Sequence, residues 1–188
     1  MIISLTGFMG CGKSSVGREL SQLLCCPFVD LDTAIEERAG LTVPDIFARM
    51  GEPGFRKLEK DTLEEIIEQY SAQSQLQKTS PTLVIALGGG AVMTEENYHA
   101  IHEKTTSIYL KASIETLVDR LSGNTDARPL LKETSHESLE KQREILREKI
   151  KDLFARREST YEQISHLKVE TDGKTISEIS KSIISSLT

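Results

Sequence analysis

The 188-residue chain has no tryptophan, three cysteines and an aromatic content of only 5%. The cysteines (Cys11, Cys25 and Cys26) are odd in number and two are adjacent, which suits reduced thiols in a cytoplasmic protein better than a disulfide framework. No apolar run approaches the ~20 residues that a membrane helix requires. A strand is expected from the second residue, which leaves no space for a signal peptide.

Positive charge is also in short supply, with 23 Lys and Arg against 29 Asp and Glu and a net charge of −6. A nucleic-acid partner would require a basic face, so this balance disfavours one. The four histidines show no metal-ligand spacing, and no internal repeat is visible. The length, the apolar content of 38% and the charged content of 28% are typical of one globular domain. We therefore expect a monomer with no nucleic-acid or membrane partner.

Three glycines, in contrast, lie close together in a short segment near the N-terminus. Residues 7–15 read GFMGCGKSS and fit the phosphate-loop pattern G-x-x-x-x-G-K-[ST]. The strand-like residues 2–5 precede them, and helical periodicity begins near Lys13. Glycines let backbone N–H groups form an anion-binding nest, to which the helix N-terminus adds its dipole. A glycine-rich turn that binds nothing is the alternative, but the flanking strand and helix favour a site for a nucleoside triphosphate.

The residue types in the loop indicate their tasks. Lys13 supplies a mobile charge for the β- and γ-phosphates of ATP, and the Ser14 hydroxyl can ligate Mg²⁺. The predicted nucleotide contacts of the loop are Gly10, Cys11, Gly12, Lys13, Ser14 and Ser15.

Two aspartates follow the first helix. Residues 26–32 are expected to form a second strand, on which Asp30 and Asp32 would point the same way because side chains alternate between faces. Ligands of open parallel sheets bind beyond the carboxyl ends of the strands, so both carboxylates should lie near the phosphate loop. One could hold the hydration shell of Mg²⁺, and the other could orient or deprotonate an acceptor hydroxyl. The alternative is that Asp32 only caps the next helix, over 33–38.

A helix over residues 52–70, after a shorter one over 42–51, carries a carboxylate within its apolar stripe. Glu59 lies in the middle of that stripe, and an inward-facing carboxylate needs a partner. Arg56, three residues earlier, is within reach of it. An arginine held in this way at the edge of a cleft can clamp an anionic substrate. A purely structural ion pair is the alternative.

Residues 83–87 are continuously apolar, as in a central parallel strand that is buried on both faces. They run directly into Gly88, Gly89 and Gly90, and glycines at such a strand end let a ligand approach the backbone closely. We expect these glycines to lie against the substrate and to shape the γ-phosphate region. The polar stretch 71–82 before them is expected to be a surface loop or an extension of the helix.

The segment 122–135 is small, polar and turn-rich, and we predict that it forms a mobile lid. Arg128 in this segment could close onto the transferring phosphoryl group as an arginine finger does. Arg120, at the base of the lid, could stack on the adenine ring. Before the lid, a helix, a strand and a helix are expected over 95–103, 107–110 and 114–121.

One long helix is expected from about residue 136 to residue 160. Its apolar stripe consists of Leu139, Leu146, Ile150 and Leu153. Arg157 is the next position on this stripe, where a buried arginine is costly unless it meets an anion. Snorkelling of Arg157 to solvent is the alternative. A strand over 167–170 and a helix over 176–187 complete the chain.

Together these elements predict a three-layer α/β fold of the P-loop NTPase type in a single domain. Its core comprises residues 1–32, 82–121 and 136–188, with substrate-binding helices over 33–70 and the lid between.

In this order, six motifs resemble the shikimate kinase family over essentially the whole chain. They are GFMGCGKSSVGREL from Gly7, FVDLD at 28–32, GEPGFRKLE at 51–59, GGG at 88–90, RPLL at 128–131 and RREST with the following Tyr161. Only the first is specific by itself, but the ordered set is highly specific.

The resemblance implies a five-stranded parallel sheet of order 2-3-1-4-5 and transfer of the γ-phosphoryl group of ATP to the 3-hydroxyl of shikimate, in aromatic amino-acid biosynthesis. It implies that Arg56 and Arg157 hold the carboxylate of shikimate and that Asp32 faces the reacting hydroxyl. Ser14 would ligate Mg²⁺ with Asp30 nearby. By position, the remaining implied contacts are Gly89 and Gly90 with shikimate, and Arg120 and Arg128 with the nucleotide.

Two other functions remain open at this stage. A related small-molecule kinase, acting on gluconate or a nucleoside monophosphate, could share the loop, the sheet and the lid. A nucleotide-dependent switch is the second, but the chain has no Asn-Lys-x-Asp motif for guanine.

Overall fold

The computed structural model describes residues 1–74, 81–122 and 138–187. Five strands form one parallel sheet in the order β2-β3-β1-β4-β5, which confirms the expected topology. The strands are β1 (Ile2–Thr6), β2 (Phe28–Asp30), β3 (Leu83–Ala86), β4 (Thr106–Lys111) and β5 (Leu167–Glu170).

Burial of the strands explains their order in the sheet. Every residue of β1 and β3 is buried, whereas β2 and β5 at the two edges are partly exposed. Ile3 of β1 lies opposite Val84 on one side and Thr106 on the other. Continuous apolar runs therefore occupy the centre, where helices cover both faces of a parallel sheet.

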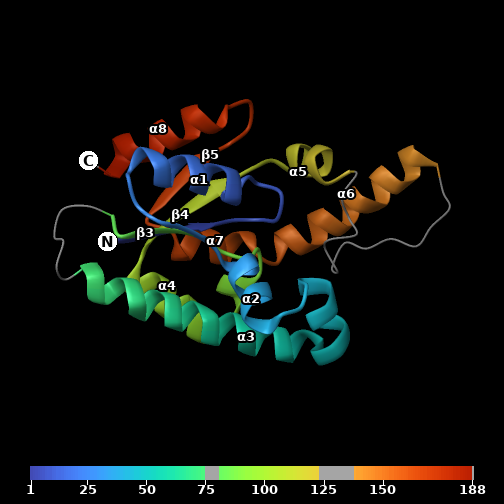
Figure 1. Cartoon of the computed structure of the whole chain (residues 1–188). Coiled ribbons are helices and arrows are strands. Elements are labelled where there is room, and N and C mark those ends of the chain that lie inside the picture. Colours follow the sequence, from blue (N-terminus) through green and yellow to red (C-terminus); the bar gives the residue numbers. More distant parts are fainter. Residues whose placement is uncertain (75–80, 123–137, 188) are drawn as a thin grey trace.

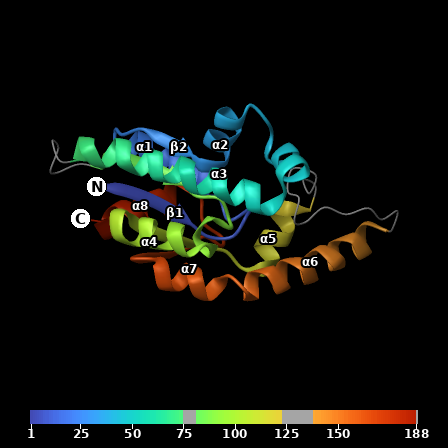
Figure 2. The same ribbon diagram turned by 90° about the horizontal axis from the view of Figure 1, so that it is seen from below.

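The helices form a layer on each face of the sheet (Figures 1 and 2). On one face lie α1 (Lys13–Leu23) and α8 (Ile176–Leu187). On the other lie α3 (Val43–Ser74), α4 (Glu95–Lys104) and α7 (Glu158–Ile164). The remaining helical elements are α2 (Leu31–Ala39), the short 3₁₀ helix η1 (Ala91–Met93), α5 (Ile114–Leu121) and α6 (Leu139–Ala155).

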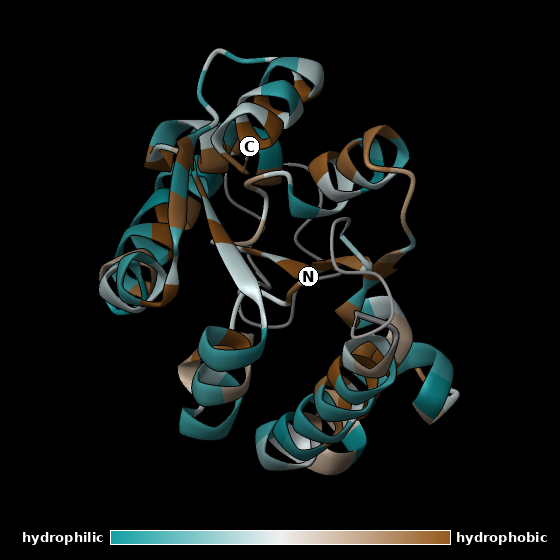
Figure 3. Cartoon of the chain, turned by 90° about the vertical axis from the view of Figure 1, so that its left-hand side faces the viewer, coloured by the Kyte–Doolittle hydropathy of each residue, from teal (hydrophilic) through white to brown (hydrophobic). Residues whose placement is uncertain are grey.

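Hydrophobic residues lie mainly on the sides of the helices that face the sheet, and hydrophilic residues lie mainly on the outward sides (Figure 3). None of the helices in the described parts of the chain is both long and apolar enough to cross a membrane. The region 42–74 contains the two expected helices, which meet at a kink where Gly51 takes φ 69° and ψ −179°. Thr42 caps the first of them, because its hydroxyl accepts a hydrogen bond from the Asp45 amide at 3.3 Å.

The expected strand over 26–32 is too long at its carboxyl end. β2 stops at Asp30, and Asp32 lies in the first turn of α2. The Asp30 carboxylate accepts a hydrogen bond from the Asp32 amide at 3.2 Å, so Asp30 and not Asp32 is the N-cap of α2. An aspartate that satisfies a free helical N–H in this way competes with extension of the strand.

The single helix expected over 136–160 is wrong. α6 ends at Ala155 and α7 begins at Glu158, because the Arg157 amide bonds back to the carbonyl of Phe154, only three residues earlier, at 2.9 Å. Leu139, placed on the buried stripe, is 85% exposed. Arg157 is buried, as expected, but as the N-cap residue of α7 and not as the last position of a continuous stripe.

Candidate active site

The phosphate loop joins β1 to α1 at the carboxyl edge of the sheet. Gly12, the residue before α1, takes φ 103°, a left-handed conformation that a side chain would strain. At Gly7, with φ 137°, an added Cβ would come within 2.6 Å of the Leu110 carbonyl oxygen. The loop conformation therefore depends on glycine at both positions.

A pocket of about 510 Å³ opens above this loop. All of the loop residues predicted to contact the nucleotide line it, and so do Asp30, Asp32, Gly89 and Arg120. The structure thus brings the end of β2 and the segment after β3 to the phosphate loop, as parallel strands that end at one edge require.

Lys13 is 9% exposed and lies against the loop itself. Its Nζ donates to the carbonyl oxygens of Gly7, at 2.8 Å, and Phe8, at 3.0 Å. The ammonium group is therefore held at the floor of the pocket, where the N-terminus of α1 adds positive potential. Both features suit a polyphosphate.

Ser14 and Asp30 present two oxygens side by side at the pocket. The Ser14 hydroxyl donates to Asp30 Oδ2 at 2.5 Å, and both residues line the cavity. Among the described residues, no group of three or more His, Cys, Asp or Glu side chains could form a protein cage for a metal ion. A hydroxyl and a carboxylate alone match Mg²⁺, which prefers oxygen ligands and keeps several waters and phosphate oxygens.

Asp32 faces the open pocket on one side and protein on the others. Desolvation by this surrounding protein raises the pKa of its carboxyl, and the nearby Asp30 carboxylate raises it further, against the opposing charge of Lys13. A Cβ added at Gly88 would lie 2.8 Å from Asp32 Oδ1, so the carboxylate packs directly on the glycine segment. A carboxyl group with a raised pKa beside a phosphate loop has the chemistry of a general base.

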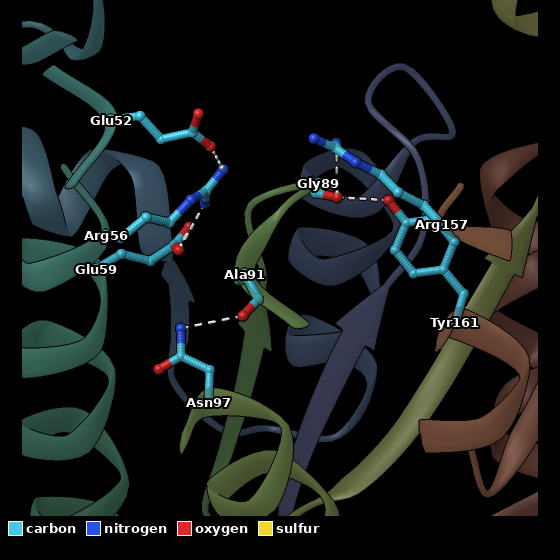
Figure 4. A network of polar contacts seen from close by, with 8 residues as sticks. All are labelled: Glu52, Arg56, Glu59, Gly89, Ala91, Asn97, Arg157 and Tyr161. Atoms are coloured by element: carbon cyan, nitrogen blue, oxygen red, sulfur yellow. Dashed lines mark hydrogen bonds and ion pairs between the residues drawn. The ribbon is translucent and has the colours of Figure 1, made fainter. Parts of the chain in front are cut away.

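Arg56 forms the ion pair expected with Glu59 (Figure 4). Its Nη1 donates to Glu59 Oε2 at 2.7 Å, and its Nη2 donates to Glu52 Oε1 at 3.2 Å. Glu59 is fully buried, and its Oε1 has no hydrogen-bond partner among the described residues. Burial raises the pKa of Glu59 in spite of the positive charge of Arg56. The buried carboxylate fixes the arginine in place.

The segment Gly88–Gly90 separates two arginines that come from distant parts of the chain (Figure 4). An added Cβ at Gly90 would meet Arg56 Nη2 at 2.6 Å. From the opposite side, Arg157 Nη1 donates to the Gly89 carbonyl oxygen at 3.1 Å. Glycine at position 90 leaves room for Arg56, and glycine at position 88 leaves room for Asp32.

Arg120 lies across the phosphate loop at the edge of the pocket. Its Nη1 donates to the carbonyl oxygens of Gly10 and Cys11, each at 3.2 Å. Stacking on adenine stays a prediction. Arg128 and the expected lid, apart from Ser122, lie outside the described residues.

One wall of the pocket was not predicted from the sequence. Lys174, Ile176 and Ile179, from the turn after β5 and the start of α8, line it together with the loop. The turn Asp172–Gly173 was available as a signal, because it follows the carboxyl end of a strand at the same sheet edge. Asp172 fastens this turn to α5, since both carboxylate oxygens accept from the Ser113 amide, at 3.1 and 3.0 Å.

A phosphate loop on a parallel sheet, an acidic side chain facing the loop and two arginines beside it define a P-loop kinase of small molecules. The model of the family "Shikimate kinase" matches residues 9–188. The chain belongs to the shikimate kinase family, and so is an ATP-dependent phosphotransferase with a small-molecule alcohol acceptor.

Individual relatives agree with this assignment. The chain is 37% identical to a shikimate kinase of Thermus thermophilus over 98% of its own length and 89% of the relative's. It is 41% identical to the enzyme of Chlorobium phaeobacteroides, over 97% and 90%. A solved structure of shikimate kinase from Acinetobacter baumannii in complex with shikimate has a TM-score of 0.84 and 31% identity, covering 99% of this chain and 92% of that one.

Proposed function

We propose that this cleft transfers the γ-phosphoryl group of ATP to the 3-hydroxyl of shikimate. The observation that carries the proposal is the convergence of Arg56 and Arg157 on one glycine segment beside Asp32 and the phosphate loop. The similar Acinetobacter baumannii structure, which holds shikimate, supports the choice of acceptor.

Arg56 and Arg157 would hold the carboxylate of the acceptor. A guanidinium presents its N–H donors in a planar fork that matches a carboxylate. A guanidinium has five N–H donors. Arg56 uses two of them and Arg157 uses one for the hydrogen bonds to protein oxygens described above, so each arginine has donors left for a ligand. Gly88, Gly89 and Gly90 would form the wall between them.

Asp32 would align the attacking hydroxyl of the acceptor and receive its proton. Its contact with the glycine segment supports a role on the acceptor side, and its position in the pocket leaves it open to the phosphate loop. Because its pKa is raised, the ionised Asp32 carboxylate is a better proton acceptor than that of an ordinary aspartate.

On the nucleotide side, the backbone N–H groups of the loop and Lys13 would neutralise the phosphate oxygens. Phosphoryl transfer has a loose transition state, so catalysis consists mostly of positioning and charge stabilisation. Lys13 would exchange contacts with the Gly7 and Phe8 carbonyls for phosphate oxygens. The assignment of Arg120 to the adenine side and of Arg128 to the phosphoryl group stays part of this proposal.

Ser14 and Asp30 would hold Mg²⁺ together with the phosphates of the nucleotide. Their adjacent oxygens have the chemistry that this ion prefers. When bound, Mg²⁺ would neutralise charge that develops on the phosphate oxygens.

We further propose that the protein works in the cytoplasm as a monomer, on small molecules alone. Three free cysteines, of which Cys25 is exposed, support a reducing compartment. The net charge of −6 supports a small-molecule acceptor rather than nucleic acid.

The direct test is ADP release from ATP and Mg²⁺ with shikimate, with gluconate, with AMP and without acceptor. Strong stimulation by shikimate alone is expected. Stimulation by gluconate or AMP instead would preserve the kinase mechanism and replace the acceptor. Equal slow hydrolysis in all four reactions would contradict the proposal and favour a nucleotide switch.

A further inference from the structure

The Gly89 carbonyl oxygen receives two hydrogen bonds from α7. One comes from Arg157 Nη1 at 3.1 Å and the other from the hydroxyl of Tyr161 (Figure 4). Tyr161 is fully buried. Its backbone amide also donates to the Arg157 carbonyl at 3.1 Å, as the first helical bond of α7. Tyr161 is therefore linked to Arg157 through the helix, through Gly89 and by a direct side-chain interaction.

This arrangement limits where the Arg157 guanidinium can point. Arg157 is 7% exposed and is the N-cap residue of α7, but its side chain makes no capping hydrogen bond to the helix. The hydrogen bond to the Gly89 carbonyl helps to orient its fork, and the adjacent Tyr161 hydroxyl also interacts directly with the guanidinium. The bond to Gly89 depends on the direction of the Gly89 carbonyl. Glycine peptides rotate easily, so the carbonyl needs a second, rigid donor to stay in place. The Tyr161 hydroxyl is that donor.

The Tyr161 hydroxyl can donate a hydrogen bond at every pH at which the protein would be assayed. Burial raises the pKa of the Tyr161 phenol far above its ordinary value, so the group remains a donor. On the other side of the segment, Asn97 Nδ2 donates to the Ala91 carbonyl at 3.0 Å. Gly89 and Ala91 are thus both fixed through their carbonyls, by helices α7 and α4.

We propose that Tyr161 is a positioning residue for the acceptor: its hydroxyl holds the Gly89 carbonyl in the direction that aims Arg157 at the acceptor carboxylate. The inference rests on the proposed role of Arg157 in binding that carboxylate. Tyr161 is fully buried and does not line the pocket above the phosphate loop, so it would act on acceptor affinity through Arg157.

Tyr109 on β4 offers a matched control. Its ring lies 5.4 Å from the ring of Tyr161 and is equally buried. Its hydroxyl, however, has no hydrogen-bond partner among the described residues. Tyr109→Phe and Tyr161→Phe therefore remove the same atom from the same cluster, and only the second removes a bond to the glycine segment.

The experiment measures KM for shikimate, KM for ATP and kcat in Tyr161→Phe, Tyr109→Phe, Arg157→Ala and the double variant Tyr161→Phe/Arg157→Ala. Loss of one neutral hydrogen bond predicts a rise of about three- to tenfold in KM for shikimate in Tyr161→Phe. KM for ATP should stay unchanged, and Tyr109→Phe should resemble the native protein. In the Arg157→Ala background, the change at Tyr161 should have no further effect.

Each contrary outcome has a distinct meaning. If Arg157→Ala raises KM for shikimate but Tyr161→Phe does not, the positioning role is excluded while the role of Arg157 stands. If Arg157→Ala itself leaves KM unchanged, the proposed role of Arg157 fails first. An equal rise of both KM values in Tyr161→Phe, or the same rise in the Arg157→Ala background, would show that Tyr161 only supports packing.

Discussion

The nucleotide half and the acceptor half of the cleft are built in different ways. The proposed nucleotide half is centred on one continuous stretch, residues 7–15, in which backbone groups and a lysine held by backbone carbonyls face the pocket. Asp30, Arg120 and Lys174 lie around this stretch. The acceptor half consists of side chains from separate elements: Asp32 of α2, Arg56 of α3 and Arg157 before α7, gathered around the glycines that follow β3.

Because of this difference, we expect that a substitution in one half will impair the binding of one substrate and leave the binding of the other intact. Local backbone rules maintain the phosphate loop whatever happens to the acceptor side. The acceptor half depends on contacts between distant helices, so single changes there should alter acceptor binding or turnover and leave nucleotide binding intact. Variants in both halves test this separation, and the variant with the largest expected effect is Asp32→Asn.

Asp32→Asn should reduce kcat by about 10²–10⁴-fold, because the amide cannot receive the proton of the acceptor hydroxyl. The affinity for ATP should remain close to native, since Asp32 belongs to the acceptor half. Steady-state kinetics together with nucleotide titration would check both. Near-native turnover would remove Asp32 from its role.

Gly90→Ala should raise KM for shikimate by about tenfold or more, because the new Cβ would displace the Arg56 guanidinium. A hydrogen bond from this group to a charged ligand would contribute about 1.5–3 kcal/mol to binding. In the matched variant Gly88→Ala the new Cβ would lie 2.8 Å from Asp32 Oδ1 and 3.1 Å from Oε1 of Glu59, the partner of Arg56. It should therefore lower kcat mainly through Asp32, and it should raise KM for shikimate less than Gly90→Ala does. Both variants should keep the native KM for ATP. Identical kinetic profiles for the two variants would contradict the separate placement of Arg56 and Asp32.

Asp30→Asn should increase the Mg²⁺ concentration needed for half-maximal activity several-fold, since one charged ligand becomes neutral. Asparagine is also a good N-cap, so α2 should remain folded. A magnesium titration of activity at saturating substrates would show the shift. An unchanged requirement would assign Asp30 to capping alone.

The acid limb of kcat should lie above the ordinary aspartate pKa of 3.8, because the pKa of Asp32 is raised and only its ionised form accepts a proton. The raised pKa means that the folded protein holds this proton more tightly than the unfolded chain does. The contribution of Asp32 to stability is therefore present at low pH and lost as pH rises through the folded-state pKa. Protonation of Asp32 at low pH therefore does not destabilise the fold, and loss of activity on the acid limb is not explained by unfolding through this residue. The residual activity of Asp32→Asn should show no such limb.

The same contrast explains how much could be predicted from the sequence. The phosphate loop, the helices over 114–121 and 176–187 and the strand over 167–170 were predicted to the residue, because short-range patterns determine them. The expected pair of Arg56 and Glu59 was confirmed, since three residues separate them on one helix.

Errors arose where capping or long-range packing decided the outcome. The capping bond of Asp30 ended β2 early, and nothing in the apolar periodicity indicated the turn at Arg157 that divides α6 from α7. Lys174 was not predicted, because a lysine in a turn does not by itself indicate a site. Its position at the pocket follows from the position of β5 in the sheet and from the turn after this strand. The contact of Tyr161 with Gly89 is likewise visible only in three dimensions.

The most direct test of the two-part cleft is calorimetric titration of Arg157→Ala with shikimate and, separately, with ATP and Mg²⁺. Loss of hydrogen bonds to a charged group predicts that the Kd for shikimate rises by about 10- to 100-fold. The Kd for ATP should stay within about twofold of native, the usual additivity for groups without shared partners. A native Kd for shikimate, or equal weakening of both ligands in a folded variant, would contradict the account.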